Sequence, residues 1–225
     1  RQAKERQLEQ VADRFKAETG FRGEISYDTN RMCLCFFEGK FANIQITADA
    51  DTTSFRNAFE QILDKVLPYT FAKREHLSKS RITNNLGIIQ TDYYQQINGY
   101  RVEGAGRLTV SYEVGRNSFT IGNGTVEVLE EARINISPDQ AVEIAKEVYN
   151  PDYKTDKSIK FDTRTELLYT KNPENQTDII YRLNYKISFW GMAIYINPSN
   201  GSLSYTRSFL IKDFSAHAEE YPVKD

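Results

Sequence analysis

The 225 residues of this chain are enough for one large domain or for two to three small ones, each with its own hydrophobic core. Hydrophobic residues make up 40% and charged residues 27%, a globular composition that excludes an intrinsically disordered chain. The 29 Lys and Arg are balanced by 31 Asp and Glu, so the net charge of −2 gives no electrostatic case for binding nucleic acid or a membrane surface. No apolar run approaches the roughly 18 residues of a membrane span.

The first 68 residues are expected to form two helices and three short strands. Residues 4–19 are amphipathic, and Gly20 ends the first helix. Strands are predicted at Glu24–Tyr27, Met32–Phe37 and Ala42–Ile46. A second helix begins after the polar residues 51–53 and stops near Pro68. The residues predicted to face the core are Leu8, Val11, Ala12 and Phe15 in the first helix, and Phe55, Phe59, Ile62, Leu63 and Val66 in the second.

The stretch YYQQINGYRVEGAGRLTVSY, residues 93–112, predicts a β-hairpin. Asn98-Gly99 supplies the positive φ angles of a two-residue turn. Before the turn, Tyr94 and Gln96 share one strand face, and Tyr93, Gln95 and Ile97 share the other. After it, apolar residues recur on even positions from 100 to 114, with a bend or bulge at Gly104-x-Gly106. Strands at Phe119–Ile121 and Thr125–Leu129 continue the meander, while residues 70–90 are expected to be irregular.

The clearest helix signal lies at residues 137–149. Ser137 is the N-cap, Pro138 occupies the first helical position and Gln140 completes a capping box. The predicted buried stripe consists of Ala141, Val142, Ala145, Val148 and Tyr149. Strands are predicted at Glu166–Thr170, Ile179–Phe189, Met192–Asn197 and Leu203–Phe209.

A helix followed by strands recurs along the chain, which predicts an α+β protein built from helix-on-antiparallel-sheet units in series. We divide it into an N-terminal helix with short strands (1–50), a second module (51–132), a third module (133–210) and a C-terminal linker (211–225).

Catalytic chemistry is not evident in the sequence. His76 and His217 lie outside any His-Glu-x-x-His motif, and no glycine-rich phosphate loop opens a helix. Cys33 and Cys35 would share one strand face, where a disulfide would strain the backbone, so we expect two reduced, packed thiols. Scattered carboxylates leave a glycosidase-type pair open, and the aromatic strands leave a stacking platform open. We predict a non-enzyme with no cofactor and no bound metal.

The hairpin region resembles the propeptide (FTP) module of fungalysin and thermolysin proteases. The family pattern is Tyr-x-Gln, a short gap, Gly-x-x-Val-x-Gly, then Leu-x-Val and a later Gly. The family usually has a second apolar residue after the first Gly, where this chain has Tyr100. The matching residues are Tyr94, Gln96, Gly99, Val102, Gly104, Leu108, Val110 and Gly122.

The third module is similar to a PepSY domain through ISPDQAVEIAKEVYN, YRLNYKI and AIYINPSNGSL. The residues that match are Ser137, Ala141, Ala145, Tyr181, Leu183, Tyr185, Tyr195, Ile196, Asn197 and Gly201. An FTP module followed by a PepSY domain is the arrangement of a thermolysin-type prosegment, and the resemblance covers roughly residues 53–209.

This resemblance implies a prosegment that assists the folding of a secreted zinc metalloprotease and inhibits it until it is cleaved off. The partner would be the thermolysin-like protease domain, in cis or in trans, and the location extracellular or periplasmic after loss of a signal peptide. Residues 70–90 and the tail after Phe209 are the expected contact segments. The alternative is a secreted or cell-surface module that binds peptide or glycan; an enzyme of unknown type ranks third.

Overall fold

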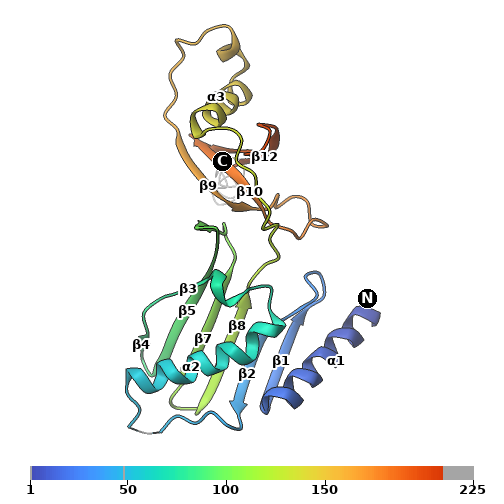
Figure 1. Ribbon diagram of the computed structural model, residues 1–225, viewed down its shortest axis with the longest axis vertical. Helices are drawn as coiled ribbons and strands as arrows, with labels where there is room; N and C mark the ends of the chain where they lie inside the picture. The colour runs from blue at the N-terminus through green and yellow to red at the C-terminus, as the bar shows by residue number, and fades with distance from the viewer. Residues whose placement is uncertain (1, 48, 210–225) are drawn as a thin grey trace, which may run out of the picture. The chain divides into compact units, whose positions relative to one another are not determined.

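The computed structural model describes residues 2–47 and 49–209 (Figure 1). Within these residues the chain forms three α-helices and two antiparallel sheets of eight and four strands, which confirms the α+β class. Contacts divide the chain into two compact units, residues 1–127 and residues 128–225. None of the described helices is long and apolar enough to cross a membrane. The linker predicted at 211–225 lies outside the described residues.

The first unit is built on the eight-stranded sheet, whose main order is β1-β2-β8-β7-β5-β3. β4 and β6 each also pair with β5. Residues 1–50 contribute β1 and β2 to the same sheet as the hairpin region, because β2 pairs with β8. The strands are β1 (Phe21–Asp28), β2 (Cys33–Phe41), β3 (Leu77–Lys79), β4 (Thr83–Asn85), β5 (Ile88–Ile97), β6 (Tyr100–Arg101), β7 (Arg107–Glu113) and β8 (Ser118–Gly124).

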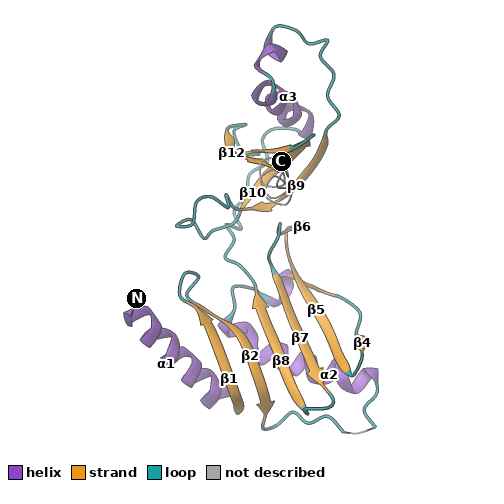
Figure 2. Ribbon diagram, turned by 180° about the vertical axis from the view of Figure 1, so that it is seen from behind, coloured by secondary structure: helices purple, strands orange, loops and turns teal. Residues whose placement is uncertain are grey.

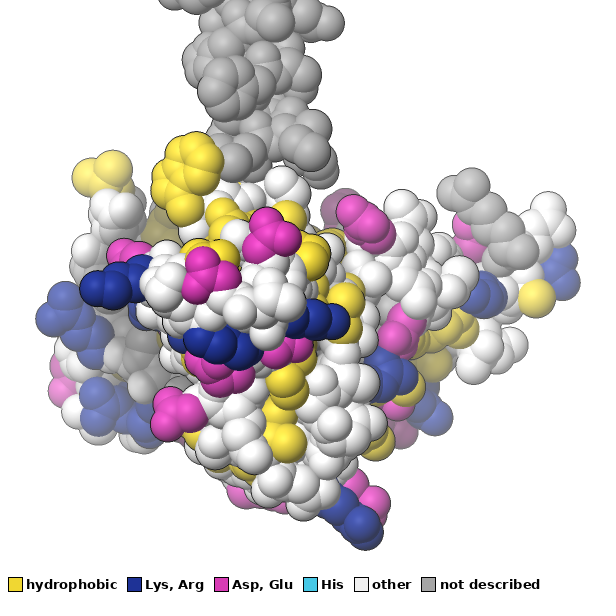
Figure 3. Space-filling view, turned by 90° about the horizontal axis from the view of Figure 1, so that it is seen from above, with side chains coloured by type: hydrophobic (Ala, Val, Ile, Leu, Met, Phe, Trp, Pro, Cys, Tyr) yellow, Lys and Arg dark blue, Asp and Glu magenta, His cyan; other side chains and the backbone are white. Residues whose placement is uncertain are grey.

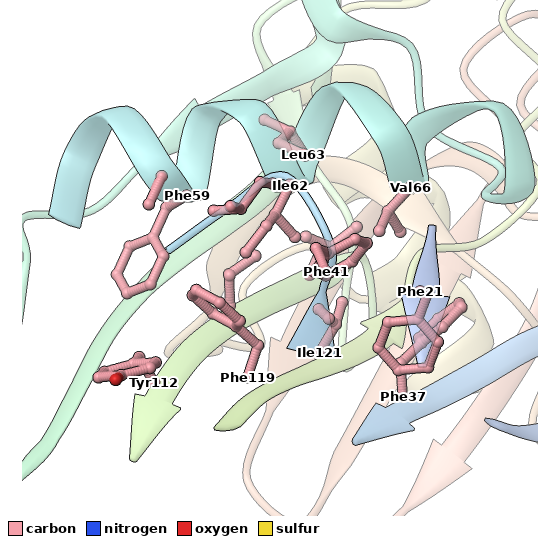
Figure 4. Packing of buried hydrophobic residues seen from close by; sticks show 14 of the residues in the cluster. Phe21, Phe37, Phe41, Phe59, Ile62, Leu63, Val66, Tyr112, Phe119 and Ile121 are labelled. Carbon is pink, nitrogen blue, oxygen red and sulfur yellow. The ribbon is translucent and has the colours of Figure 1, made fainter. Parts of the chain in front are cut away.

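Two helices cover one face of this sheet and leave the other without a described helix (Figures 1 and 2). α1 (Gln2–Thr19) inserts Phe15 between the rings of β1 and β2, with its centroid 4.9 Å from that of Phe37. α2 (Thr52–Val66) is capped by Asp51, which accepts a 2.8 Å hydrogen bond from the Ser54 amide. All five apolar residues predicted on α2 are buried, and Phe59, Ile62 and Val66 point toward the sheet in Figure 4.

Several local expectations for the first unit were wrong. Residues 42–46 form no third strand, because the chain turns back after Phe41 and makes only an isolated bridge from Phe41 to Ile44. Residues 125–129 leave the sheet after β8, and only Val128 forms a bridge, to Tyr181. The stretch 70–90 is more regular than expected, since β3, β4 and the short 3₁₀ helices Leu67–Tyr69 and Arg74–His76 lie in or next to it.

The second unit places α3 (Pro138–Tyr149) on one face of the four-stranded sheet, in the order β12-β11-β10-β9. The capping box of Ser137 and Gln140 is formed as predicted. Ala141 and Ala145 of α3 are fully buried between the helix and the sheet. Val148, which was predicted to be buried, is exposed because it lies on the outer side of the last helical turn. The remaining elements are β9 (Arg164–Thr170), β10 (Arg182–Phe189), β11 (Met192–Ile196), β12 (Leu203–Ser208) and the 3₁₀ helix Pro151–Lys154.

Candidate interaction site at the tip of the β5–β6 hairpin

The predicted hairpin turn is present, but the strand that follows it is short. Asn98 and Gly99 have φ angles of 53° and 82°, as a two-residue turn requires. β6 then pairs with β5 for two residues only, and the chain leaves the sheet before β7 begins at Arg107. The expected bulge is therefore a loop, residues 102–106. Val102 is buried, Gly104 is exposed, and the later even residue Val114 is 55% exposed.

Gly106 folds this loop back onto the sheet. Its carbonyl accepts a 2.7 Å hydrogen bond from the Gln95 amide, and its own amide donates to the Gly124 carbonyl at 2.9 Å. Its φ is 77°, and an added Cβ would lie 2.9 Å from the Val102 Cβ. A side chain at this position is excluded both by backbone conformation and by space.

The side chain of Gln95, whose backbone amide holds Gly106, links β5 to the segment that follows β8. Its side chain is buried, donates from Nε2 to the Val126 carbonyl at 3.0 Å, and accepts from the Val126 amide at 2.8 Å. Both ends of the amide are thus satisfied in a site that water does not reach. The sequence predicted the strand face of Gln95 but not its hydrogen bonds to Val126. A polar residue among the apolar residues of the buried strand face could have indicated such a buried hydrogen-bonding role.

These contacts leave a hollow of about 430 Å³ on the surface of the hairpin tip. Four residues of the FTP-like motif, Tyr94, Gln96, Val102 and Gly104, come together in its lining. Tyr94 is 42% exposed, so its ring is available to a partner. The other lining residues are Gln95, Arg101, Ala105, Gly106 and Arg107.

A polar network holds Arg107 at the edge of the hollow. Its guanidinium donates to both carboxylate oxygens of Asp92, at 3.0 and 2.9 Å, and the Thr109 hydroxyl donates to the same carboxylate at 2.7 Å. The Asp92 side chain is 14% exposed and the Arg107 side chain 52% exposed. A bidentate ion pair of this kind fixes the orientation of the guanidinium plane. Arg107 therefore presents an oriented, solvent-facing cation beside Tyr94, its cross-strand neighbour.

The hollow lies next to an outer edge of the sheet. β3 is the last strand in the main order, and Ser78 pairs with Tyr94. The stretch 70–90, expected to contact a partner, thus supplies the strand beside the hollow. An outer strand offers backbone donors and acceptors to an added extended segment.

The other FTP-like motif residues have structural positions. Leu108 and Val110 are completely buried in the core, and Gly99 forms the turn. Gly122 is half-buried in β8, paired with Phe36 and Thr109.

The PepSY-like motif residues are also mainly internal. The Tyr185 hydroxyl donates to the Ile136 carbonyl at 3.0 Å, and Asn197 accepts from both the amide and the hydroxyl of Ser199. Gly201 has a φ of 74° and faces Ile144. Leu183, Tyr195 and Ile196 are buried, Tyr195 stacks on Tyr205 at 4.1 Å, and Tyr181 pairs with Val128.

The described residues contain no group of three or more His, Cys, Asp or Glu placed to hold a metal ion. Cys33 and Cys35 are free thiols, and burial raises the pKa of both, which keeps them protonated at neutral pH. His76 lies in a 3₁₀ helix, and His217 is outside the described residues. On the face seen in Figure 3, basic and acidic side chains are interspersed.

Comparison with protein-family models gives no match, and none of the curated proteins matches the chain. Among solved structures, the chain is similar to the C-terminal domain of YpeB from Bacillus megaterium, with a TM-score of 0.34 and 12% sequence identity. The similarity covers 90% of this chain and 96% of that one. So distant a likeness carries no argument about function.

Proposed function

We propose that the chain is a non-catalytic interaction protein and that the hairpin-tip hollow, with Tyr94 and Arg107, is its contact site. The finer proposal is that it acts as the prosegment of a secreted thermolysin-like zinc metalloprotease, as a folding assistant and inhibitor, in cis or in trans. The observation that carries this proposal is the convergence of Tyr94, Gln96, Val102 and Gly104 on one solvent-facing hollow. Of these residues Tyr94 is 42% exposed and contributes little to the core, which is the pattern expected of a contact residue.

The chemistry of the site fits recognition of a protein surface. Tyrosine and arginine are the residue types that most often dominate binding energy at interfaces, since each combines a large flat group with directed hydrogen bonding. Arg107 is held in place before binding by Asp92, so little side-chain entropy is lost when a partner docks. The free edge of β3 beside Tyr94 can pair with an extended segment of the partner, in an interface of about 1,200–2,000 Å².

The test adds the chain in trans to a refolding and to a mature thermolysin-like protease and measures peptide hydrolysis. We expect non-covalent inhibition of the mature enzyme and a higher yield of active enzyme on refolding. Tyr94→Ala should weaken inhibition by about tenfold or more. Ile88→Ala is the matched control, because Ile88 lies on the same face of β5, is similarly exposed at 43%, and does not line the hollow. Absence of both inhibition and refolding assistance would overturn the prosegment proposal.

The second candidate, a peptide- or glycan-binding module, is favoured by the helix-free face of the first sheet (Figure 2). Half-buried hydroxyls of Thr109, Ser111 and Thr120 lie there on adjacent strands, with Ser111 paired to Thr120. Such a row presents donors and acceptors at regular spacing. Binding to a peptide or glycan array that is lost in Thr109→Val, together with no effect on any thermolysin-like protease, would favour this candidate.

A further inference from the structure

A second hollow lies where the C-terminal end of β2 meets the beginnings of β1 and β8. Its volume is about 560 Å³, within the range of small-ligand sites. β2 and β8 pair as far as Gly39 and Phe119, and β2 then continues to Phe41. Since the chain turns back to Ile44 instead of forming a third strand, no strand among the described residues fills the space beside Lys40 and Phe41 on the β8 side of β2.

The lining of this hollow combines apolar and cationic side chains. Its accessible apolar residues are Ala42, which is exposed, and Ile46, which is half-buried, and the core residues Phe41, Ile44 and Phe119 lie beneath them. Gln45 and Asn117 add amide groups. The Asn117 side-chain oxygen accepts a 2.6 Å hydrogen bond from the Tyr112 hydroxyl, which leaves the N–H groups of the amide to donate elsewhere. Arg22 and Lys40, both exposed, complete the lining.

Arg22 and Lys40 are placed directly opposite each other in the β1–β2 ladder. Like charges in that position repel and destabilise the strand pair. Neither residue forms an ion pair within the part of the chain that the structure describes. The next pair on the same face of the ladder is Glu24 and Glu38, which lie diagonally from the two cations, and Glu38 forms an ion pair with Arg116 at 3.5 Å. An anion between the two cations would turn their repulsion into attraction.

We propose that this hollow binds a carboxylate that carries an apolar group. The carboxylate lies between the Arg22 guanidinium and the Lys40 ammonium, and the apolar group lies against Ala42 and Ile46. The guanidinium is suited to this task because its planar fork matches a carboxylate with two parallel hydrogen bonds. Two sources share this chemistry: the C-terminal residue of a peptide and a free aliphatic acid.

The experiment follows backbone amide signals of the whole chain by NMR during titration with four probes. These are N-acetyl-leucine, its amide, octanoate and the peptide acetyl-Gly-Gly-Leu with a free carboxyl end. We expect saturable shifts at residues 40–46, 117 and 119 with the acids, and binding of the amide at least about tenfold weaker, because it lacks the charge. Tighter binding of the peptide identifies a chain terminus as the ligand, and tighter binding of octanoate identifies a free acid.

Arg22→Gln and Lys40→Gln each remove one cation from the exposed end of the ladder. Each should weaken N-acetyl-leucine binding by about tenfold, while Arg56→Gln, which removes an exposed cation of α2 outside the lining, should leave binding unchanged. Without ligand, the first two variants should unfold at the same temperature as the parent chain or a higher one, since the repulsion is gone. Equal affinity for the acid and its amide, or no saturation by about 10 mM of any acid, overturns the proposal.

Discussion

The two units use the same architecture, a helix on an antiparallel sheet, but differ in where their motif residues lie. In the second unit most of the PepSY-like residues are in the interior: Ala141 and Ala145 pack against the sheet and Tyr195 is fully buried, whereas Ser137 caps a helix at the surface. In the first unit the FTP-like residues divide, with Leu108 in the core and Tyr94 beside an open hollow. Residues of one sequence motif can therefore be structural, surface contacts, or a mixture of both. The structure is needed to tell which residues have which role.

The largest expected effect comes from a core truncation in each unit. Leu183→Ala and Leu108→Ala should each lower the free energy of unfolding by about 2–5 kcal/mol, because both side chains are buried and leave cavities. Hydrogen exchange of backbone amides, measured at increasing denaturant concentration, reports the unfolding of each unit separately. If the units unfold independently, each substitution will shift only the transition of its own unit. A cost below about 1 kcal/mol for Leu183→Ala would mean that its site collapses around the smaller side chain.

Two glycines with positive φ differ in how much destabilisation an added Cβ should cause, because their neighbours differ in mobility. Gly106→Ala should cost about 2–4 kcal/mol, since the new Cβ meets the Cβ of Val102, which cannot move without the backbone. Gly201→Ala should cost less, about 1–2 kcal/mol, because its Cβ meets only the mobile end of the Ile144 side chain. Thermal melts of the two variants would contradict this account if their order were reversed.

The N-cap of α3 is a smaller and purely local effect. Ser137→Ala removes the 3.2 Å hydrogen bond from the Gln140 amide to the Ser137 hydroxyl and should cost about 1 kcal/mol. Ser26→Ala, at an exposed position of β1, serves as a control and should change stability by less than about 0.5 kcal/mol. Equal effects of the two substitutions in urea melts would show that the cap contributes nothing.

Features set by local periodicity were predictable from the sequence, and features set by distant pairing were not. The apolar face of α2, the capping box of Ser137 and the turn at Asn98 each depend on residues within a few positions of one another. The joining of β2 to β8 connects residues about 80 positions apart, and no pattern in either strand encodes it.

The candidate site was predictable in its residues but not in its shape. Alternation correctly placed Tyr94 and Gln96 on the face of β5 opposite Gln95. The hollow itself depends on the loop 102–106, which Gln95 and Gly106 hold through bonds to residues 126 and 124. In the segment 42–46, the alternation of apolar and polar residues favoured a strand. The chain instead forms a turn closed by the bridge from Phe41 to Ile44.

The smallest expected effect is the most direct test of the contrast between the units, because it removes a single oxygen from a motif tyrosine in each. Tyr185→Phe loses the hydrogen bond to the Ile136 carbonyl and should cost about 0.5–1.5 kcal/mol. Tyr94→Phe should change stability by less than about 0.5 kcal/mol, since the ring is exposed and its hydroxyl has no hydrogen-bond partner among the described residues. If Tyr94 contacts a partner protein, Tyr94→Phe will weaken the affinity for that partner. The variant chain alone will then unfold at the same temperature as the parent chain. A Tyr94→Phe variant that unfolds as readily as Tyr185→Phe would place Tyr94 with the structural residues and leave the hollow without its principal contact.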